Sequence, residues 1–180
     1  MSSESCWYGL GTIGEVRFYG HVGDCAAVVQ CAERPMQYDA AMKESVSHDA
    51  ALAAQSCQEI LADGGDLLDL WRFGILQTID YYTSYFKRGG PTLASHVFDQ
   101  EPLTGHASVD AAFAALADYL ATRDGWAVPT WVASQVVTPP WFVAPIARRP
   151  GYFHDEALRV TPDEFRRRNI YIGIGDLSRA

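Results

Sequence analysis

Cysteine is scarce in this sequence, with four residues in 180, and the four form neither a C-x-x-C pair nor a regular framework (Cys6, Cys25, Cys31 and Cys57). Small secreted proteins that depend on disulfides carry cysteine at a higher density. The first ten residues, MSSESCWYGL, also lack the basic and apolar regions of a secretory signal. We therefore expect reduced thiols in a cytoplasmic protein that is stabilised by its core and not by cross-links.

The short motifs of catalysis and metal binding are also missing. The sequence has no P-loop and no G-x-S-x-G, and its five histidines form neither H-x-x-x-H nor H-E-x-x-H. Gly9–Gly14 matches G-x-G-x-x-G, but it neither follows a convincing strand nor opens a helix, as a dinucleotide site requires. His154-Asp155-Glu156 is interpreted as a solvated loop, because neighbours on an extended chain point to opposite sides. We expect no metal, no cofactor and no catalytic residue.

Basic residues are sparse in the first three quarters of the chain. Residues 1–136 hold 7 Lys and Arg against 17 Asp and Glu, a net charge of −10, whereas residues 137–180 hold 7 against 5, a net charge of +2. An acidic body repels the phosphate backbone of nucleic acids. The basic tail could still contact an acidic protein partner, or nucleic acid weakly. The alternative is a solvated surface with a modest dipole.

The stretch Asp66–Lys87 is the feature around which the rest of the chain is organised. Twelve of its first 21 residues are large and apolar or aromatic, which predicts a helix contacted on more than one side. Asp66 is a good N-cap, and Gly89-Gly90-Pro91 is a stop signal. The helix is long enough to cross a bilayer, but Asp69, Arg72 and Asp80 lie within it and argue against a membrane span.

Within this central helix, Trp71, Ile75 and Ile79 fall on one stripe and are predicted core residues. Gly74 marks either a close helix crossing or a kink. Residues 88–107 are predicted as a long connection in which Ala94–Phe98 is a strand or a single helical turn.

Other segments also have helical patterns. Residues 39–62 predict a helix with a break near Ser47-His48-Asp49, and Ser108 is the expected cap of an amphipathic helix that ends near Thr122. Thr161-Pro162-Asp163-Glu164 predicts a capping box for a short helix to Arg168. The alternation in residues 169–174 then predicts a brief strand.

The first 35 residues allow two interpretations. Alternation over residues 16–22 predicts a strand, and Gly23-Asp24 fits a hairpin turn that leads to a second strand over Cys25–Cys31. The alternative is a helix from Asp24 to Glu33. The β-branched pair Val28-Val29 favours the hairpin.

Residues 126–145, WAVPTWVASQVVTPPWFVAP, hold three tryptophans and four prolines. Proline fits neither a helix interior nor a central strand, so this segment predicts an ordered, extended loop with aromatic anchors that cover the helical core. The alternative hypothesis is a small-ligand site, or an active site, between this loop and the central helix. Its expected lining is Trp71, Tyr82, Trp131, Trp141 and Phe142.

One cluster of charge has a functional pattern, namely the five arginines Arg148, Arg149, Arg166, Arg167 and Arg168. Guanidinium groups bind phosphates and carboxylates through paired hydrogen bonds, so the cluster predicts an anion-binding or partner-binding contact. The alternative is a solvated helix end at which cations offset the helix dipole. Because no helix-turn-helix with a basic recognition helix is visible, sequence-specific DNA binding is not expected.

The last 75 residues carry a family pattern. It consists of the helix DAAFAALADYL (110–120), then VPTW (128–131), PWFV (140–143), TPDEFRRRNIYI (161–172) and the terminal DLSRA. This part resembles small actinobacterial-type helical proteins, some of which are similar to antitoxin partners of nucleotidyltransferase-like toxins. The resemblance implies a protein partner and carries over no functional residue.

Together these observations predict a mainly α-helical protein with a single domain over residues 1–180. It is a helical bundle around the central helix, with a β-hairpin appended at 1–35 and a Trp/Pro-rich ordered loop and basic module at 126–180. The predicted function is a non-enzymatic interaction module, antitoxin-like or an adaptor subunit, that binds a protein partner in the cytoplasm and does not contact a membrane.

Overall fold

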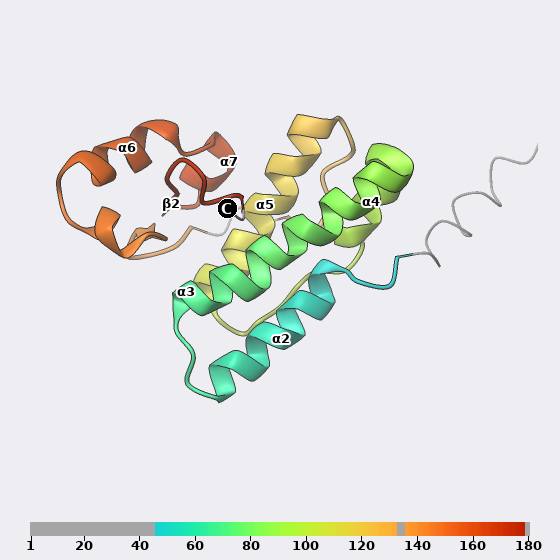
Figure 1. The fold of residues 1–180 in the computed structure, drawn as a ribbon, viewed down its shortest axis with the longest axis horizontal. Coiled ribbons are helices and arrows are strands. Elements are labelled where there is room, and N and C mark those ends of the chain that lie inside the picture. Colours follow the sequence, from blue (N-terminus) through green and yellow to red (C-terminus); the bar gives the residue numbers. More distant parts are fainter. Residues whose placement is uncertain (1–45, 133–135, 179–180) are drawn as a thin grey trace, which may run out of the picture. The chain divides into compact units, whose positions relative to one another are not determined.

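The computed structural model describes residues 46–132 and 136–178. The chain divides into two compact units, Met1–Tyr38 and Asp39–Ala180, and every described residue belongs to the second unit. The hairpin predicted at 1–35 and the start of the helix predicted at 39–62 lie outside the described residues. Within them the protein is mainly α-helical, as predicted, with one short two-stranded sheet (Figure 1).

The elements follow one another along the described chain with short connections. In order they are α2 (Ala50–Ala62), α3 (Leu67–Leu70), the π-helical segment η2 (Trp71–Ile75), α4 (Leu76–Ser95), the 3₁₀ segment η3 (His96–Phe98), α5 (Ala107–Asp124), β1 (Trp141–Phe142), the 3₁₀ segment η4 (Pro145–Arg148), α6 (Tyr152–Val160), α7 (Asp163–Arg166) and β2 (Ile170–Tyr171).

The central helix begins where the sequence predicts. The Asp66 carboxylate accepts hydrogen bonds from the backbone N–H groups of Leu68 and Asp69, at 2.8 and 3.0 Å. The Asp69 carboxylate accepts one in return from the Asp66 N–H at 3.4 Å, which completes a capping box. From this cap, α3, η2 and α4 follow one another without an intervening loop.

The predicted stop at Gly89-Gly90-Pro91 is a kink and not the end of helical structure. Gly90 has φ 70° and ψ −165°, a conformation that costs glycine little, and Pro91 starts a new helical stretch that reaches Ser95 and continues as η3. The prediction of a long connection over residues 88–107 is therefore wrong for the first half of that range, which is helical. Ala94–Phe98 takes the helical option and not the strand.

Gly74 lies at the closest approach between η2 and the helices packed on it. A Cβ atom built on Gly74 would lie 2.5 Å from the Cys57 sulfur of α2 and 3.3 Å from the Phe113 ring of α5. Of the two roles expected for this glycine, the structure shows the close crossing. The Thr78 hydroxyl donates to the Gly74 carbonyl at 2.8 Å.

The Cys57 thiol at this crossing is a packed, protonated side chain. Burial raises its pKa to about 11, and the negative charge of Asp110 acts in the same direction with a smaller effect.

The core is built around η2 and the α5 face that carries small residues. Trp71 and Ile75 are buried, as predicted, whereas Ile79 is half-buried and packs against the edge of the core.

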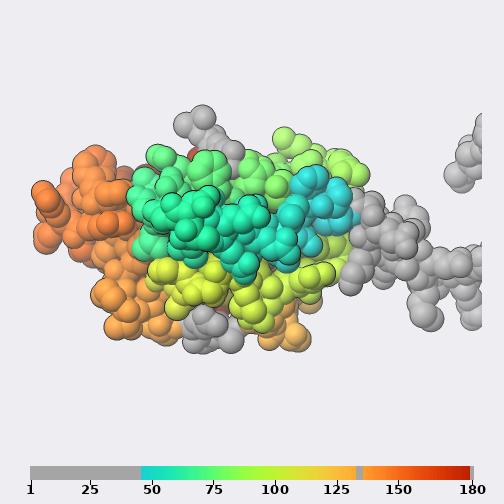
Figure 2. Space-filling model, turned by 90° about the horizontal axis from the view of Figure 1, so that it is seen from below, coloured from blue at the N-terminus to red at the C-terminus, as the bar shows by residue number. Residues whose placement is uncertain are grey.

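Figure 2 shows α2 lying between residues of α4 and the segment that follows η3. The Gln58 amide of α2 donates to the Leu103 carbonyl of that segment at 2.7 Å.

A partly buried polar network links α4, α5 and the Trp/Pro-rich segment. The Tyr82 hydroxyl donates to the Asp124 carboxylate at 2.6 Å and accepts from the Trp126 indole N–H at 2.9 Å. Burial, and then the hydrogen bond to Asp124, raise the pKa of Tyr82. The ion pair with Arg123 and the bond from Tyr82 lower the pKa of Asp124 against the opposing effect of burial. The carboxylate therefore stays ionised and holds the Tyr82 hydroxyl, which in turn accepts from Trp126.

Two expectations about the carboxyl-terminal module are wrong. His154-Asp155-Glu156 lies in the first turn and centre of α6 and not in a loop. Thr161 does not cap α7, because its hydroxyl donates to the Ala157 carbonyl at 2.6 Å and accepts from the Ile172 N–H at 2.9 Å. Pro162 is the N-cap position of α7 and makes no side-chain cap.

The cap predicted for α5 is also displaced by two residues. The helix begins at Ala107, so Ser108 lies inside it, and the N-cap residue His106 makes no side-chain cap bond. The Asp110 carboxylate instead accepts from the Thr104 N–H and hydroxyl, at 2.7 and 2.6 Å, which ties the preceding loop to the first turn.

The brief strand predicted over residues 169–174 is present as β2. It pairs in parallel with β1, with Trp141 opposite Ile170 and Phe142 opposite Tyr171. The partner strand lies in the Trp/Pro-rich segment, where the sequence predicts a loop. Among the described helices, none is both long enough and apolar enough to cross a membrane.

Replacing Gly74 with alanine should destabilise the fold. The methyl group would overlap the Cys57 sulfur, and overpacking of this kind costs about 1–3 kcal/mol, more than the ~1 kcal/mol that alanine gains in helix propensity. Urea denaturation should show a lower free energy of unfolding for Gly74→Ala. The loss should be smaller in a Cys57→Ala background, because the overlapping sulfur is then absent. An unchanged or higher stability of Gly74→Ala would contradict the close crossing.

Candidate functional site

The structure separates the five predicted arginines into two groups. Arg166, Arg167 and Arg168 lie in α7 and immediately after it, whereas Arg148 ends η4 and Arg149 follows it. Arg148, Arg149, Arg166 and Arg167 are exposed, and Arg168 is buried. The cluster seen in the sequence is therefore two surfaces and one internal residue.

Arg168 holds α7 against α5. The residue is 3% exposed, and its guanidinium donates to the Asp118 carboxylate at 3.0 Å and to the Glu164 carbonyl at 2.7 Å. Arg167 donates to the same carboxylate at 3.1 Å from the solvent side. A buried arginine paired in this way fixes two helices together and is not available to bind a partner.

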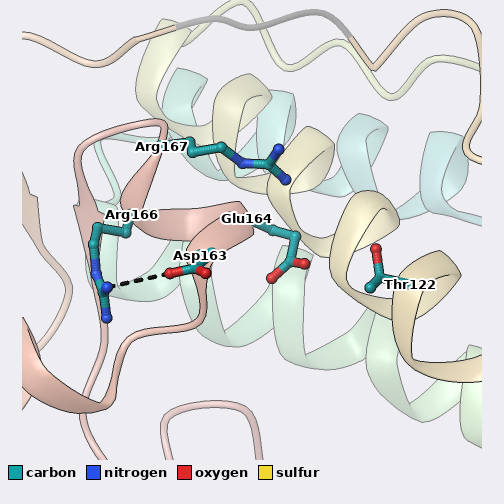
Figure 3. Close-up of a pocket in the computed structure, with 5 residues that line it drawn as sticks. All are labelled: Thr122, Asp163, Glu164, Arg166 and Arg167. Atoms are coloured by element: carbon teal, nitrogen blue, oxygen red, sulfur yellow. Dashed lines mark hydrogen bonds and ion pairs between the residues drawn. The ribbon is translucent and has the colours of Figure 1, made fainter.

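An open cavity of about 560 Å³ lies between α7 and the end of α5 (Figure 3), lined by Thr122, Asp163, Glu164, Arg166 and Arg167. Arg166 pairs with Asp163 at 3.1 Å and also donates to the Thr161 carbonyl at 2.8 Å. With two carboxylates and two guanidiniums in its lining, the cavity has no excess positive charge. A polyanion would therefore meet as much repulsion as attraction here.

The other arginine pair adjoins a set of exposed apolar side chains. We call this the η4–α6 surface and define it as Ile146, Arg148, Arg149, Tyr152 and Phe153. Ile146 is 61% exposed, Tyr152 is 73% exposed and Phe153 is 47% exposed, and the Tyr152 and Phe153 rings meet edge to face with centroids 5.4 Å apart.

Contacts beneath this surface hold it in position. The His154 Nδ1–H donates to the Ala147 carbonyl at 2.9 Å, which joins α6 to η4. The Phe142 ring stacks on His154 at 4.5 Å and on Tyr171 at 4.8 Å, and the Arg148 side chain donates to the Phe142 carbonyl at 3.4 Å. The exposed side chains thus project from a backbone that is anchored to the small sheet.

The five side chains predicted to line a pocket do not share one cavity among the described residues. Trp71 and Trp141 meet edge to face at 5.7 Å and are both buried, and Phe142 is part of the ring stack described above. Tyr82 belongs to the network with Asp124 and Trp126. Trp131 donates its indole N–H to the Phe98 carbonyl at 3.0 Å and lines a separate, smaller cavity with Trp126.

Sequence reasoning identified Arg148 and Arg149 but missed Ile146, Tyr152 and Phe153 beside them. The signal was present, because an isoleucine and two aromatic residues flank the arginine pair within eight positions. Exposure could not be seen in the sequence, since the same residue types at Phe142 and Phe165 are partly or fully buried.

Removing the Asp118 carboxylate should destabilise the fold far more than removing a carboxylate of the open cavity. Asp118→Ala leaves the Arg168 guanidinium buried without its ionic partner, which costs about 3–5 kcal/mol. Asp163→Ala breaks a solvent-exposed ion pair with Arg166 and should cost less than about 1 kcal/mol. Thermal and urea unfolding of both variants measure the difference. Equal losses would show that the buried pair is not the contact that joins α7 to α5.

The predicted arginines thus contribute to two candidate sites for recognition in the described chain, the open cavity beside α7 and the η4–α6 surface. The first is balanced in charge, whereas the second combines exposed aromatic rings with two exposed arginines. Comparison of the chain with models of known protein families, with curated proteins and with solved structures gave no match.

Proposed function

We propose that this protein is a non-enzymatic interaction module whose η4–α6 surface binds an acidic, apolar segment of a partner protein. The observation that carries the proposal is the exposure of Ile146, Tyr152 and Phe153 beside Arg148 and Arg149 on an anchored backbone. Tyrosine, phenylalanine and arginine are enriched in the parts of protein interfaces that contribute most to binding.

The geometry favours a preformed contact. Phe142, His154 and the Ala147 carbonyl hold η4 and α6 together, so little backbone ordering is needed when a partner binds. Tyr152 and Phe153 are large and lose few rotamers on burial, which makes them efficient anchors. A partner that covers them removes apolar surface from water, at about 25 cal/mol per Å².

The charge of the surface indicates the charge of the partner. Residues 145–160 carry Arg148, Arg149 and Arg159 against Asp155 and Glu156, whereas residues 1–136 carry a net charge of −10. An acidic partner segment would be attracted to this module and repelled by the body, which fixes where it can bind. Weak contact of the same arginines with nucleic acid is the competing outcome, and a steep loss of binding with salt would identify it.

In its finer form, the proposal is an antitoxin-like or adaptor subunit that acts in the cytoplasm. The support for this form is the resemblance in the last 75 residues, which implies a protein partner. The partner would then be the product of an adjacent gene, and the η4–α6 surface would contact it.

The test is co-expression of the chain with the product of the adjacent gene, followed by size-exclusion chromatography and calorimetry. Tyr152→Ser and Arg149→Glu should each weaken the complex, Tyr152→Ser by about 2 kcal/mol or roughly thirtyfold in Kd, as expected for an interface anchor. Phe73→Ser and Lys87→Glu are matched controls, because both side chains are exposed and belong to η2 and α4 and not to the η4–α6 surface. These controls should leave the Kd unchanged.

Two results would overturn the proposal at different levels. If the adjacent gene product forms no complex, the antitoxin-like form fails. The broader form is then examined by selecting peptides on the purified chain, which should enrich acidic sequences with apolar anchors that lose binding to Tyr152→Ser. Enrichment of basic sequences, or equal binding to the Phe73→Ser and Tyr152→Ser variants, would contradict a partner site at the η4–α6 surface.

A further inference from the structure

The open cavity between α7 and the end of α5 has an unusual lining for its size. Its volume of about 560 Å³ falls within the ~300–1,000 Å³ of small-ligand sites, which are mostly lined by apolar side chains. All the described residues of this lining are polar, namely Thr122, Asp163, Glu164, Arg166 and Arg167. A ligand held here must therefore be polar and must bind through hydrogen bonds and charge.

The two carboxylates of the lining differ in their contacts. Asp163 pairs with Arg166 at 3.1 Å, and Arg166 also donates to the Thr161 carbonyl at 2.8 Å, so both side chains are already used within the protein. Glu164 is half-buried, and its carboxylate has no hydrogen bond or ion pair with a described residue. The Glu164 backbone carbonyl accepts from Arg168 at 2.7 Å, which holds this residue in position. Its carboxylate is thus a fixed acceptor that lacks a donor.

Arg167 and Thr122 provide the complementary groups. The Arg167 side chain is 63% exposed and uses one N–H group to bind Asp118 at 3.1 Å, so the other donors of its guanidinium remain for a ligand. The Thr122 hydroxyl is also without a hydrogen bond to a described residue. Figure 3 shows the Glu164 carboxylate pointing across the cavity toward Thr122, whereas Asp163 is turned to Arg166.

Glu164 and Arg167 have opposite charges and lie three positions apart, yet no ion pair joins them among the described contacts. An ion of one sign would be attracted by one of these groups and repelled by the other. A ligand that carries both charges can satisfy both groups through charge-assisted hydrogen bonds and leaves neither opposed by a like charge. The balanced lining therefore selects against simple anions and simple cations alike.

We infer that this cavity binds a small polar zwitterion of the amino-acid class. The ammonium group of the ligand donates to the Glu164 carboxylate, and its carboxylate accepts from the Arg167 guanidinium. A polar side chain on the ligand reaches the Thr122 hydroxyl. The site lies on α7 and the end of α5, and it is independent of the partner-binding role proposed for the η4–α6 surface.

The test uses serine as the probe and two analogues of the same shape. Serinamide keeps the ammonium group and lacks the carboxylate, whereas glycerate keeps the carboxylate and has a hydroxyl in place of the ammonium group. Titration of the full chain, followed by backbone amide signals in nitrogen-15 correlation spectra, should show saturable shifts at residues 163–167 and at Thr122, and none in α2. Each analogue should bind at least about tenfold more weakly than serine, because it loses one hydrogen bond between charged groups.

Glu164→Gln should weaken serine binding by at least about tenfold, because the amide keeps the shape and removes the charge. Arg167→Gln should have a similar effect, and the buried pair of Arg168 with Asp118 remains in it. Glu101→Gln is the matched control, since it removes an exposed carboxylate that does not line the cavity, and it should leave the affinity unchanged. Circular dichroism confirms that the variants are folded.

The comparison of the three probes on the unaltered chain needs no variant. Equal or tighter binding of glycerate would identify a simple anion site, and equal or tighter binding of serinamide would identify a simple cation site. Either result would overturn the inference, as would an unchanged serine affinity in Glu164→Gln. The absence of a saturable shift at residues 163–167 with millimolar serine would also overturn it.

Discussion

The close crossing at Gly74 is the constraint on which the rest of the structure depends. Because this residue has no side chain, the Cys57 sulfur of α2 and the Phe113 ring of α5 both reach the backbone of the central helix from their own sides. The π-helical turn from Trp71 to Ile75 lies at this point, so the widest part of the central helix coincides with its tightest contacts. With α2 and α5 fixed in this way, the central helix is covered on more than one side, which explains why it tolerates so many apolar residues.

Single hydrogen bonds from indole rings connect this helical core to the extended segments. Trp71 donates to the Asp176 carbonyl at 2.9 Å, Trp126 donates to the Tyr82 hydroxyl and Trp131 donates to the Phe98 carbonyl. Each ring buries apolar surface and satisfies its one polar atom against a fixed acceptor. The proline-containing segment can therefore be ordered without a helix or a long strand.

The arginines show how tertiary contacts assign different roles to the same residue type. Arg166, Arg167 and Arg168 are consecutive, yet the first pairs with Asp163 in solvent, the second reaches Asp118 from outside and the third is buried against it. Asp118 lies 50 positions before Arg168, so the chain sequence gives no sign of this pair. Arg148 and Arg149 keep their exposure because η4 is a short turn at the surface. A charge cluster in the sequence is thus neither one site nor one function.

By itself the sequence determined the helical class, the capping box at Asp66, the core positions Trp71 and Ile75, and the short strand at Ile170–Tyr171. These features follow from local patterns of spacing and capping, which are read within a few residues. Only the tertiary structure decided that Thr161 bonds to Ile172 instead of capping α7, that Arg168 is internal and that Tyr152 and Phe153 are exposed. It also brought His96 and Asp99 to the same cavity as Trp131. Each of these depends on partners or on burial set by distant segments, and no local preference encodes which surface of a short helix will remain uncovered.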